Sequence, residues 1–134
     1  MNMNMVQSFI EKLNIYRIVV LTILMCSSVA ADAQSDYYMQ QARSYQREVE
    51  YYTKQAQGYD KEAEYYNRQA QGYLREAECY SKRKKYDQVK SYQRRAKDAT
   101  ERAESYKRKA DDARDKAKSY MKKAEDSLQK AKRK

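Results

Sequence analysis

The carboxylates are the side chains of this sequence best suited to catalysis. They recur with cations four residues further on, as in Glu104 with Arg108 and Asp112 with Lys116, and such pairs are typical of solvated helix surfaces. An acid–base pair needs two carboxylates in unlike environments, whereas a repeat gives each carboxylate a similar one. The 134 residues include no His and two Cys, which argues against a His-based centre or a transition-metal site. We therefore expect a protein that is not an enzyme and has no catalytic residue, metal site or cofactor.

Covalent links between chains are the second chemistry that these residue types allow. Cys26 falls in a predicted leader, which leaves Cys79 as a lone thiol in the mature chain. In a secreted protein a lone thiol indicates either an intermolecular disulfide or a free reactive group. The alternative is a small residue on a helix surface with no chemical role.

Three tyrosines, Tyr37, Tyr51 and Tyr65, recur at intervals of 14 residues outside the predicted hydrophobic seam. If they are exposed, they are available for self-association or for oxidative cross-linking with Lys in a hardened matrix such as a shell. The alternative is that they only widen a helical interface.

Positive charge is concentrated in the second half of the chain. Residues 34–80 carry six basic and eight acidic groups, whereas residues 81–134 carry 21 basic and nine acidic groups. A basic segment of this kind can bind an anionic polymer or surface through counterion release. The candidate contacts are Lys82, Arg83, Lys84, Lys85, Lys130, Lys132, Arg133 and Lys134. The alternative is a solvated helix face, because the cations are mixed with Asp and Glu, and predicted secretion argues against nucleic acid as the partner.

A 14-residue repeat positions all of these side chains. Residues 51–64 read YYTKQAQGYDKEAE, residues 65–78 read YYNRQAQGYLREAE, and residues 105–118 read SYKRKADDARDKAK. Fourteen residues are two heptads, so the underlying period of 3.5 predicts helices that pair as in a coiled coil. Good helix formers dominate and Pro is absent, which favours helix further. The sequence therefore predicts an all-α fold.

Small residues and tyrosines form a narrow seam along each predicted helix, with the small residue at heptad position a and Tyr at d. Larger aliphatic side chains are few, so the Tyr rings must supply most of the hydrophobic stabilisation. A lone helix of this composition is marginal, and we expect a homo-oligomer or association with other matrix proteins. The residues assigned to the seam and to self-association are Tyr45, Tyr52, Tyr59, Tyr66, Tyr73, Ala56, Ala63, Ala70, Tyr92, Tyr106 and Tyr120.

The seam loses phase in the middle of the chain, where Ala77 and Val89 are 12 residues apart instead of 14. Four consecutive cations precede Asp87, which is a potential N-cap. We expect a first long helix at 34–82, a basic turn or stutter at 83–88 and a second long helix at 89–134. Two arrangements stay open: a long antiparallel hairpin, or an extended coiled coil of continuous helices with a local stutter.

Residues 1–33 have the three parts of a secretory signal peptide. A leader with Lys12 and Arg17 precedes an apolar run, and Ala31-Asp32-Ala33 places the cleavage between Ala33 and Gln34. The 14 apolar or small residues from position 18 to 31 fall short of the ~20 that a spanning helix needs, so we expect no membrane span in the mature chain. The alternative is an uncleaved anchor.

These patterns together predict a secreted, extracellular structural protein: a self-associating matrix or scaffold component, with cross-linking through Tyr and Lys as an option. Two alternatives remain. One is a secreted binder of anionic polymers or surfaces that uses the basic second half. The other is a helical protein of the bacterial periplasm or cell envelope.

Overall fold

The computed structural model describes residues 3–25 and 33–133, and these residues form three helices. They are α1 (Met3–Met25), α2 (Ala33–Lys82) and α3 (Tyr86–Lys132), and no strand occurs among the described residues. The prediction of an all-α fold is confirmed. Cys26 and the remainder of the apolar run lie outside the described residues.

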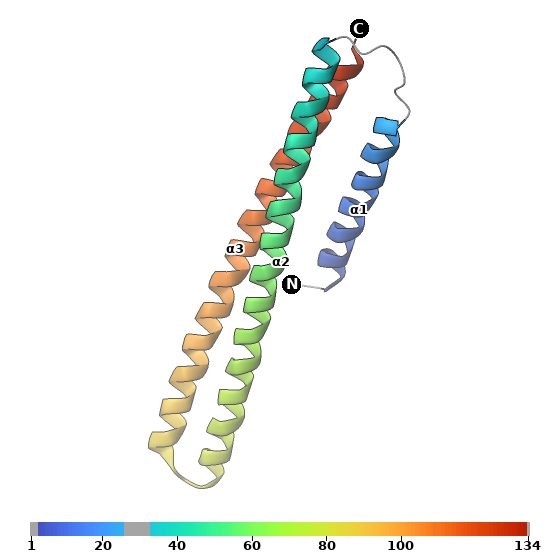
Figure 1. The fold of residues 1–134 in the computed structure, drawn as a ribbon. Coiled ribbons are helices and arrows are strands. Elements are labelled where there is room, and N and C mark those ends of the chain that lie inside the picture. Colours follow the sequence, from blue (N-terminus) through green and yellow to red (C-terminus); the bar gives the residue numbers. More distant parts are fainter. Residues whose placement is uncertain (1–2, 26–32, 134) are drawn as a thin grey trace.

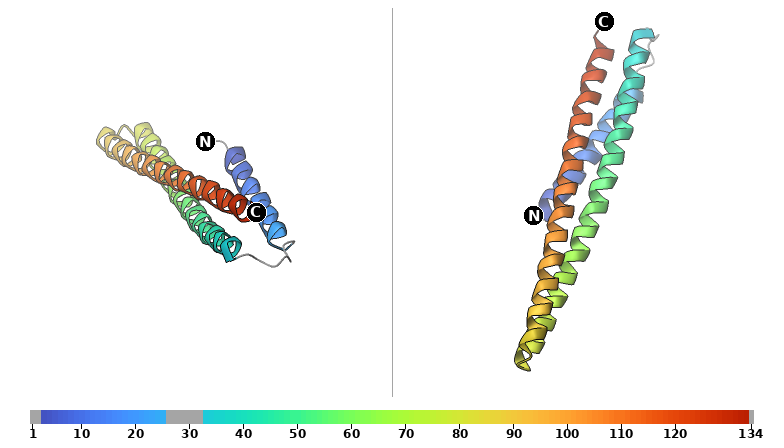
Figure 2. Two further views of the ribbon diagram at one scale, coloured as in Figure 1. Left: turned by 90° about the horizontal axis from the view of Figure 1, so that it is seen from above. Right: turned by 90° about the vertical axis from the view of Figure 1, so that its left-hand side faces the viewer.

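The two long helices lie side by side and run in opposite directions (Figures 1 and 2). With 50 and 47 residues, they are about 75 and 70 Å long at a rise of ~1.5 Å per residue. At the open end, the Ser35 hydroxyl donates to the Ala131 carbonyl at 3.2 Å. Of the two arrangements that the sequence leaves open, the described chain has the hairpin.

The chain reverses over only three residues, 83–85, so the turn is shorter than the predicted 83–88. Lys84 has a φ of 57°, and the Lys85 amide donates to the Tyr80 carbonyl at 3.1 Å. The sequence predicted Asp87 as the N-cap of α3, and this prediction is wrong. Lys85 occupies the N-cap position, and its side chain makes no capping hydrogen bond. Asp87 lies in the first turn instead, where its negative charge interacts favourably with the positive N-terminal end of the helix dipole. The helix therefore begins at Tyr86 rather than at residue 89.

Small side chains form the core between α2 and α3. They come from the a positions of both helices, and each is 0–6% exposed. Because these side chains are short, the two helix axes can approach closely. The buried members of this column are Ala42, Val49, Ala56, Ala63, Ala70, Ala77, Ala96, Ala103, Ala110, Ala117 and Ala124.

Helix α1 packs on one side of the hairpin (Figure 2). Leu13 is 6% exposed and shares a cluster with Val49 and Ala117. The Tyr16 hydroxyl donates to the Met121 carbonyl at 3.1 Å. Among the described residues, no helix combines the length and the apolar character needed to cross a membrane.

Candidate functional site

Nine tyrosines form a ladder between α2 and α3: the eight assigned to the predicted seam and Tyr80. Tyr106 lies between two tyrosines of α2: its ring centroid is 6.2 Å from that of Tyr59 and 5.6 Å from that of Tyr66, and the second pair is stacked with an interplanar angle of 10°. Tyr120 and Tyr92 repeat this arrangement one double heptad away on either side. The tyrosine ladder consists of Tyr45, Tyr52, Tyr59, Tyr66, Tyr73 and Tyr80 on α2, with Tyr92, Tyr106 and Tyr120 on α3.

The ladder gives the 14-residue period a physical cause. Each α3 tyrosine fills the space between two successive α2 tyrosines, so α3 carries one Tyr for every two on α2. In the intervening heptads α3 places Ala99, Ala113 and Ser127, each 4% exposed. The sequence predicted that these tyrosines lie on the seam, but only the structure shows this two-to-one pairing.

A column of six cations runs along α3 beside the ladder, and five of them cover ladder rings. The sequence did not predict this column. Its members follow one another at seven-residue intervals, and each lies over at least one Tyr ring. The Lys123 ammonium is 4.7 Å from the Tyr120 centroid, and that of Lys109 is 4.9 Å from the Tyr106 centroid. Contacts of this kind contribute about 0.5–1 kcal/mol at exposed sites. The cation column is Arg95, Arg102, Lys109, Lys116, Lys123 and Lys130.

The predicted polyanion contacts do not come together. The group at 82–85 lies at the turn, whereas the group at 130–133 lies at the opposite end of α3, about 70 Å away for 47 helical residues. Lys82 pairs with Glu78 at 3.1 Å, and Lys130 lies over the Tyr38 ring at 5.9 Å. Lys134 lies outside the described residues. A seven-residue period among the cations was the signal that would have pointed to the cation column instead.

The three tyrosines proposed for cross-linking are exposed, with Tyr37, Tyr51 and Tyr65 at 61, 54 and 49%. Each ring meets the edge or face of the tyrosine that follows it in the chain, at centroid distances of 5.2–5.4 Å. The Tyr51 and Tyr65 hydroxyls also accept hydrogen bonds at 2.8 Å from the glutamines four residues on. These phenols are therefore held in position and remain accessible.

Cys79 is an exposed free thiol. It follows Tyr65 by 14 residues, so it occupies the position that the exposed tyrosines have in earlier repeats. The proposed cleavage-site residues Ala33 and Gln34 are exposed in the first turn of α2.

The structure also reveals one nearly buried charge that the sequence did not single out. The Arg114 side chain is 10% exposed and pairs with Asp60 of α2 and, at 2.8 Å, with Asp111 of its own helix. It ties the two long helices together, because a buried guanidinium needs such partners.

Burial, together with the negative charge of Glu125, raises the pKa of Tyr16 to about 12.

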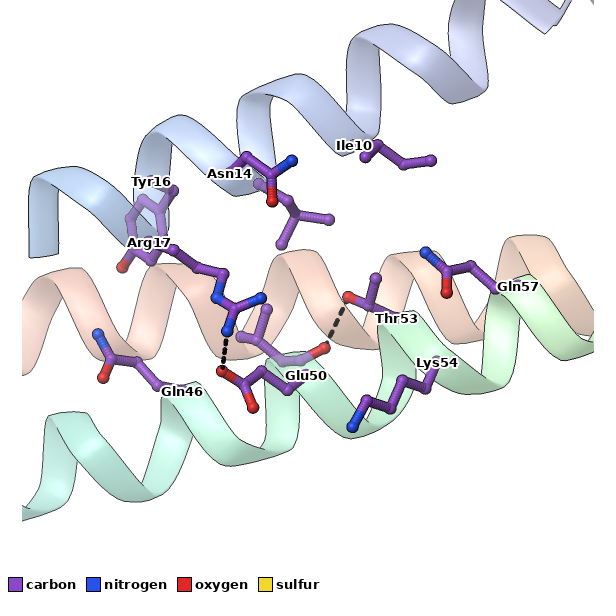
Figure 3. A pocket seen from close by; sticks show the side chains of 11 residues that line it. Ile10, Asn14, Tyr16, Arg17, Gln46, Glu50, Thr53, Lys54 and Gln57 are labelled. Carbon is purple, nitrogen blue, oxygen red and sulfur yellow. Dashed lines mark hydrogen bonds and ion pairs between the residues drawn. The ribbon is translucent and has the colours of Figure 1, made fainter. Parts of the chain in front are cut away.

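A groove of about 380 Å³ lies between α1 and the hairpin. Figure 3 shows Arg17 of α1 reaching Glu50 of α2, at 3.3 Å, and Thr53 donating to the Val49 carbonyl at 2.7 Å. The described residues contain no group of His, Cys, Asp or Glu side chains that could hold a metal ion. The groove includes residues of the predicted leader, so it exists only in a chain that keeps them.

Comparison with protein-family models, with curated proteins and with solved structures finds no match to this chain.

Proposed function

We propose that this protein is a secreted, non-enzymatic structural protein whose hairpin self-associates in an extracellular matrix or scaffold. The observation that carries the proposal is the row of exposed, positioned tyrosines at 14-residue intervals along a helix of 50 residues. Regular aromatic side chains on a long rigid rod suit repeated lateral contacts, since aromatic rings dominate interface energetics. Pairing of the helices as a coiled coil of double heptads and cleavage of the leader after Ala33 are parts of the same proposal.

The proposal includes covalent cross-linking of neighbouring hairpins through their exposed tyrosines. Tyr37, Tyr51 and Tyr65 are accessible, and lysines are abundant, so an external oxidising enzyme acting on the phenols would join neighbouring rods. The bacterial periplasm remains the alternative location, because a secretory leader serves both destinations.

Sedimentation equilibrium is the experiment that tests self-association. It is performed on the purified protein, with its N-terminus established by intact mass, in the presence of reductant, with circular dichroism across the same concentrations. An oligomer that grows with concentration is expected. A helical monomer at every concentration would refute the scaffold proposal.

A second candidate function, binding of an anionic polymer, is favoured by the cation column. Six exposed cations about 10.5 Å apart, one per heptad at ~1.5 Å per residue, could follow a linear polyanion. Titration with a sulfated glycan at several salt concentrations separates the two functions. A binder loses affinity steeply as salt rises, whereas association through tyrosines changes little.

A further inference from the structure

We propose that a second copy of this chain packs on the broad face of the hairpin opposite to the side of α1, a face that is uncovered with or without the leader, which gives a two-fold symmetric four-helix dimer. This inference rests on the self-association proposed above and names the surface that mediates it. Helix α1 contacts the hairpin through residues such as Met121, which directly follows a ladder tyrosine. The cation column follows the ladder tyrosines by three residues and therefore lies on the opposite side of the seam. We call that side the open face.

On α2 the open face carries an outer column in which large and small side chains alternate every seven residues. The exposed tyrosines alternate with Ser44, Gly58 and Gly72. A Cβ added at Gly58 or Gly72 would meet nothing within 4 Å, so packing within the hairpin does not require glycine there. Glycine in a helix interior is less stable than alanine, and these two residues leave recesses between the protruding rings. The outer column of α2 is Tyr37, Ser44, Tyr51, Gly58, Tyr65, Gly72 and Cys79.

The corresponding outer column of α3 alternates as well, with the same 14-residue period. Serines there alternate with aspartates, and none of the aspartates takes part in an ion pair with a described residue. The outer column of α3 is Ser91, Asp98, Ser105, Asp112, Ser119 and Asp126.

A two-fold axis parallel to the helices places α2 of one copy against α3 of the other, in antiparallel orientation. This rotation does not change the position of any residue along the helix axis. The tyrosine ladder fixes those heights, because Tyr66 stacks on Tyr106. Because Tyr106 lies between Tyr59 and Tyr66 and the helices are antiparallel, Tyr65 lies within about two residues, or ~3 Å, of the height of Ser105 of the second copy. One heptad earlier on α2, Gly58 lies equally near the height of Asp112 of the second copy. Tyr51 and Tyr65 each meet a serine, and each glycine leaves room for a carboxylate.

Charge supports the same pairing. The open face of α2 carries Glu48, Glu62 and Glu76, and none of them forms an ion pair with a described residue. Opposite them in the dimer lies the cation column, with Lys109 of the second copy level with Glu62. The two arms also differ in net charge, −2 for residues 34–80 and +12 for residues 81–134, so α2 against α3 is the complementary combination.

The available area is sufficient for a stable dimer. The outer column of α2 spans 42 residues, or about 60 Å, and two helices side by side are about 20 Å wide. The open face therefore offers roughly 1,200 Å² per copy, compared with about 800 Å² per partner in a standard stable interface.

The test is sedimentation equilibrium of the purified protein in reductant, with the double variant Tyr51→Ala/Tyr65→Ala. We expect its dimer dissociation constant to rise at least 100-fold, because both rings anchor the interface twice in the dimer. The matched control is Tyr86→Ala/Leu74→Ala, which removes two side chains that are 63 and 54% exposed but lie off the open face. The control should change the constant less than threefold, and both variants should keep the helicity of the hairpin when dilute.

Each outcome decides a different point. Wild-type protein that is monomeric at every concentration would overturn both this inference and self-association. Wild-type protein that associates, with two variants that behave alike, would overturn only the open face. The register is tested by mixing Tyr65→Cys with Ser105→Cys chains, both also carrying Cys79→Ser. After removal of the reductant, oxidation by dissolved oxygen should form a mixed disulfide readily, and equally fast formation with Asp98→Cys in place of Ser105→Cys would refute the register.

Discussion

Replacing Tyr106 by alanine perturbs the centre of the tyrosine ladder. The ring lies between those of Tyr59 and Tyr66, and the Lys109 ammonium lies over it at 4.9 Å. Each aromatic pair is worth about 0.5–1.5 kcal/mol beyond area burial, and the cation contact about 0.5–1 kcal/mol. Half-burial of the ring contributes roughly 1 kcal/mol more. We therefore expect Tyr106→Ala to lower the free energy of unfolding by about 3 kcal/mol.

Urea denaturation followed by circular dichroism at 222 nm measures this loss. For an m value of about 1.5–2 kcal/mol per M, the midpoint should fall by about 1.5–2 M. The protein is kept dilute, and the midpoint is repeated at two concentrations so that association does not contribute to it.

The matched control is Tyr51→Ala, which removes an exposed ring with one aromatic neighbour. Its cost should stay below about 1 kcal/mol, the range of a single aromatic pair. Equal midpoints for the two variants would refute the reasoning, since the ladder would then not be what holds α2 to α3.

Four further changes test other contacts. Arg114→Ala leaves two carboxylates without their partner and should cost about 1–3 kcal/mol. Lys97→Ala removes an exposed pair and should cost less than about 0.5 kcal/mol, so equal urea midpoints would contradict this. Ala110→Leu overfills a site that is 0% exposed and should cost about 1–3 kcal/mol by the same assay. Because the pKa of Tyr16 is raised from 10.0 to about 12, in a chain that keeps α1 its contribution to stability is complete below pH 10 and is lost as the pH rises to 12; Tyr16→Phe should remove that part of the pH dependence. If Cys79 joins chains, non-reducing gels should show a dimer that reductant abolishes and that Cys79→Ser lacks. A monomer under both conditions would exclude the disulfide.

Helix and seam were predictable because both depend on local sequence. The heptad spacing of Ala and Tyr, the good helix formers and the absence of Pro act within one or two helical turns. The loss of phase between Ala77 and Val89 placed the reversal to within a few residues. The exact start of α3 was not predictable from the cap residue, because backbone hydrogen bonds at Lys85 replaced the side-chain cap expected from Asp87.

The candidate surfaces were harder to predict, because they depend on residues that are distant in the sequence. The cations near the turn form a run in the sequence, yet the hairpin separates them from the basic residues at the end of α3. The bridge from Arg114 to Asp60 spans 54 positions in the chain, so no local pattern indicated it.

The sequence by itself determined that the chain is helical, which side of each helix is apolar and where the chain turns. These properties follow from residue propensity and periodicity, which are local. Only the tertiary structure decided that each α3 tyrosine lies between two α2 tyrosines, and that five cations of α3 cover the ladder rings. The reason is physical: the antiparallel register depends on how rings and small side chains of two helices fill the same space. A period of 14 allows several such registers, and packing selects one of them.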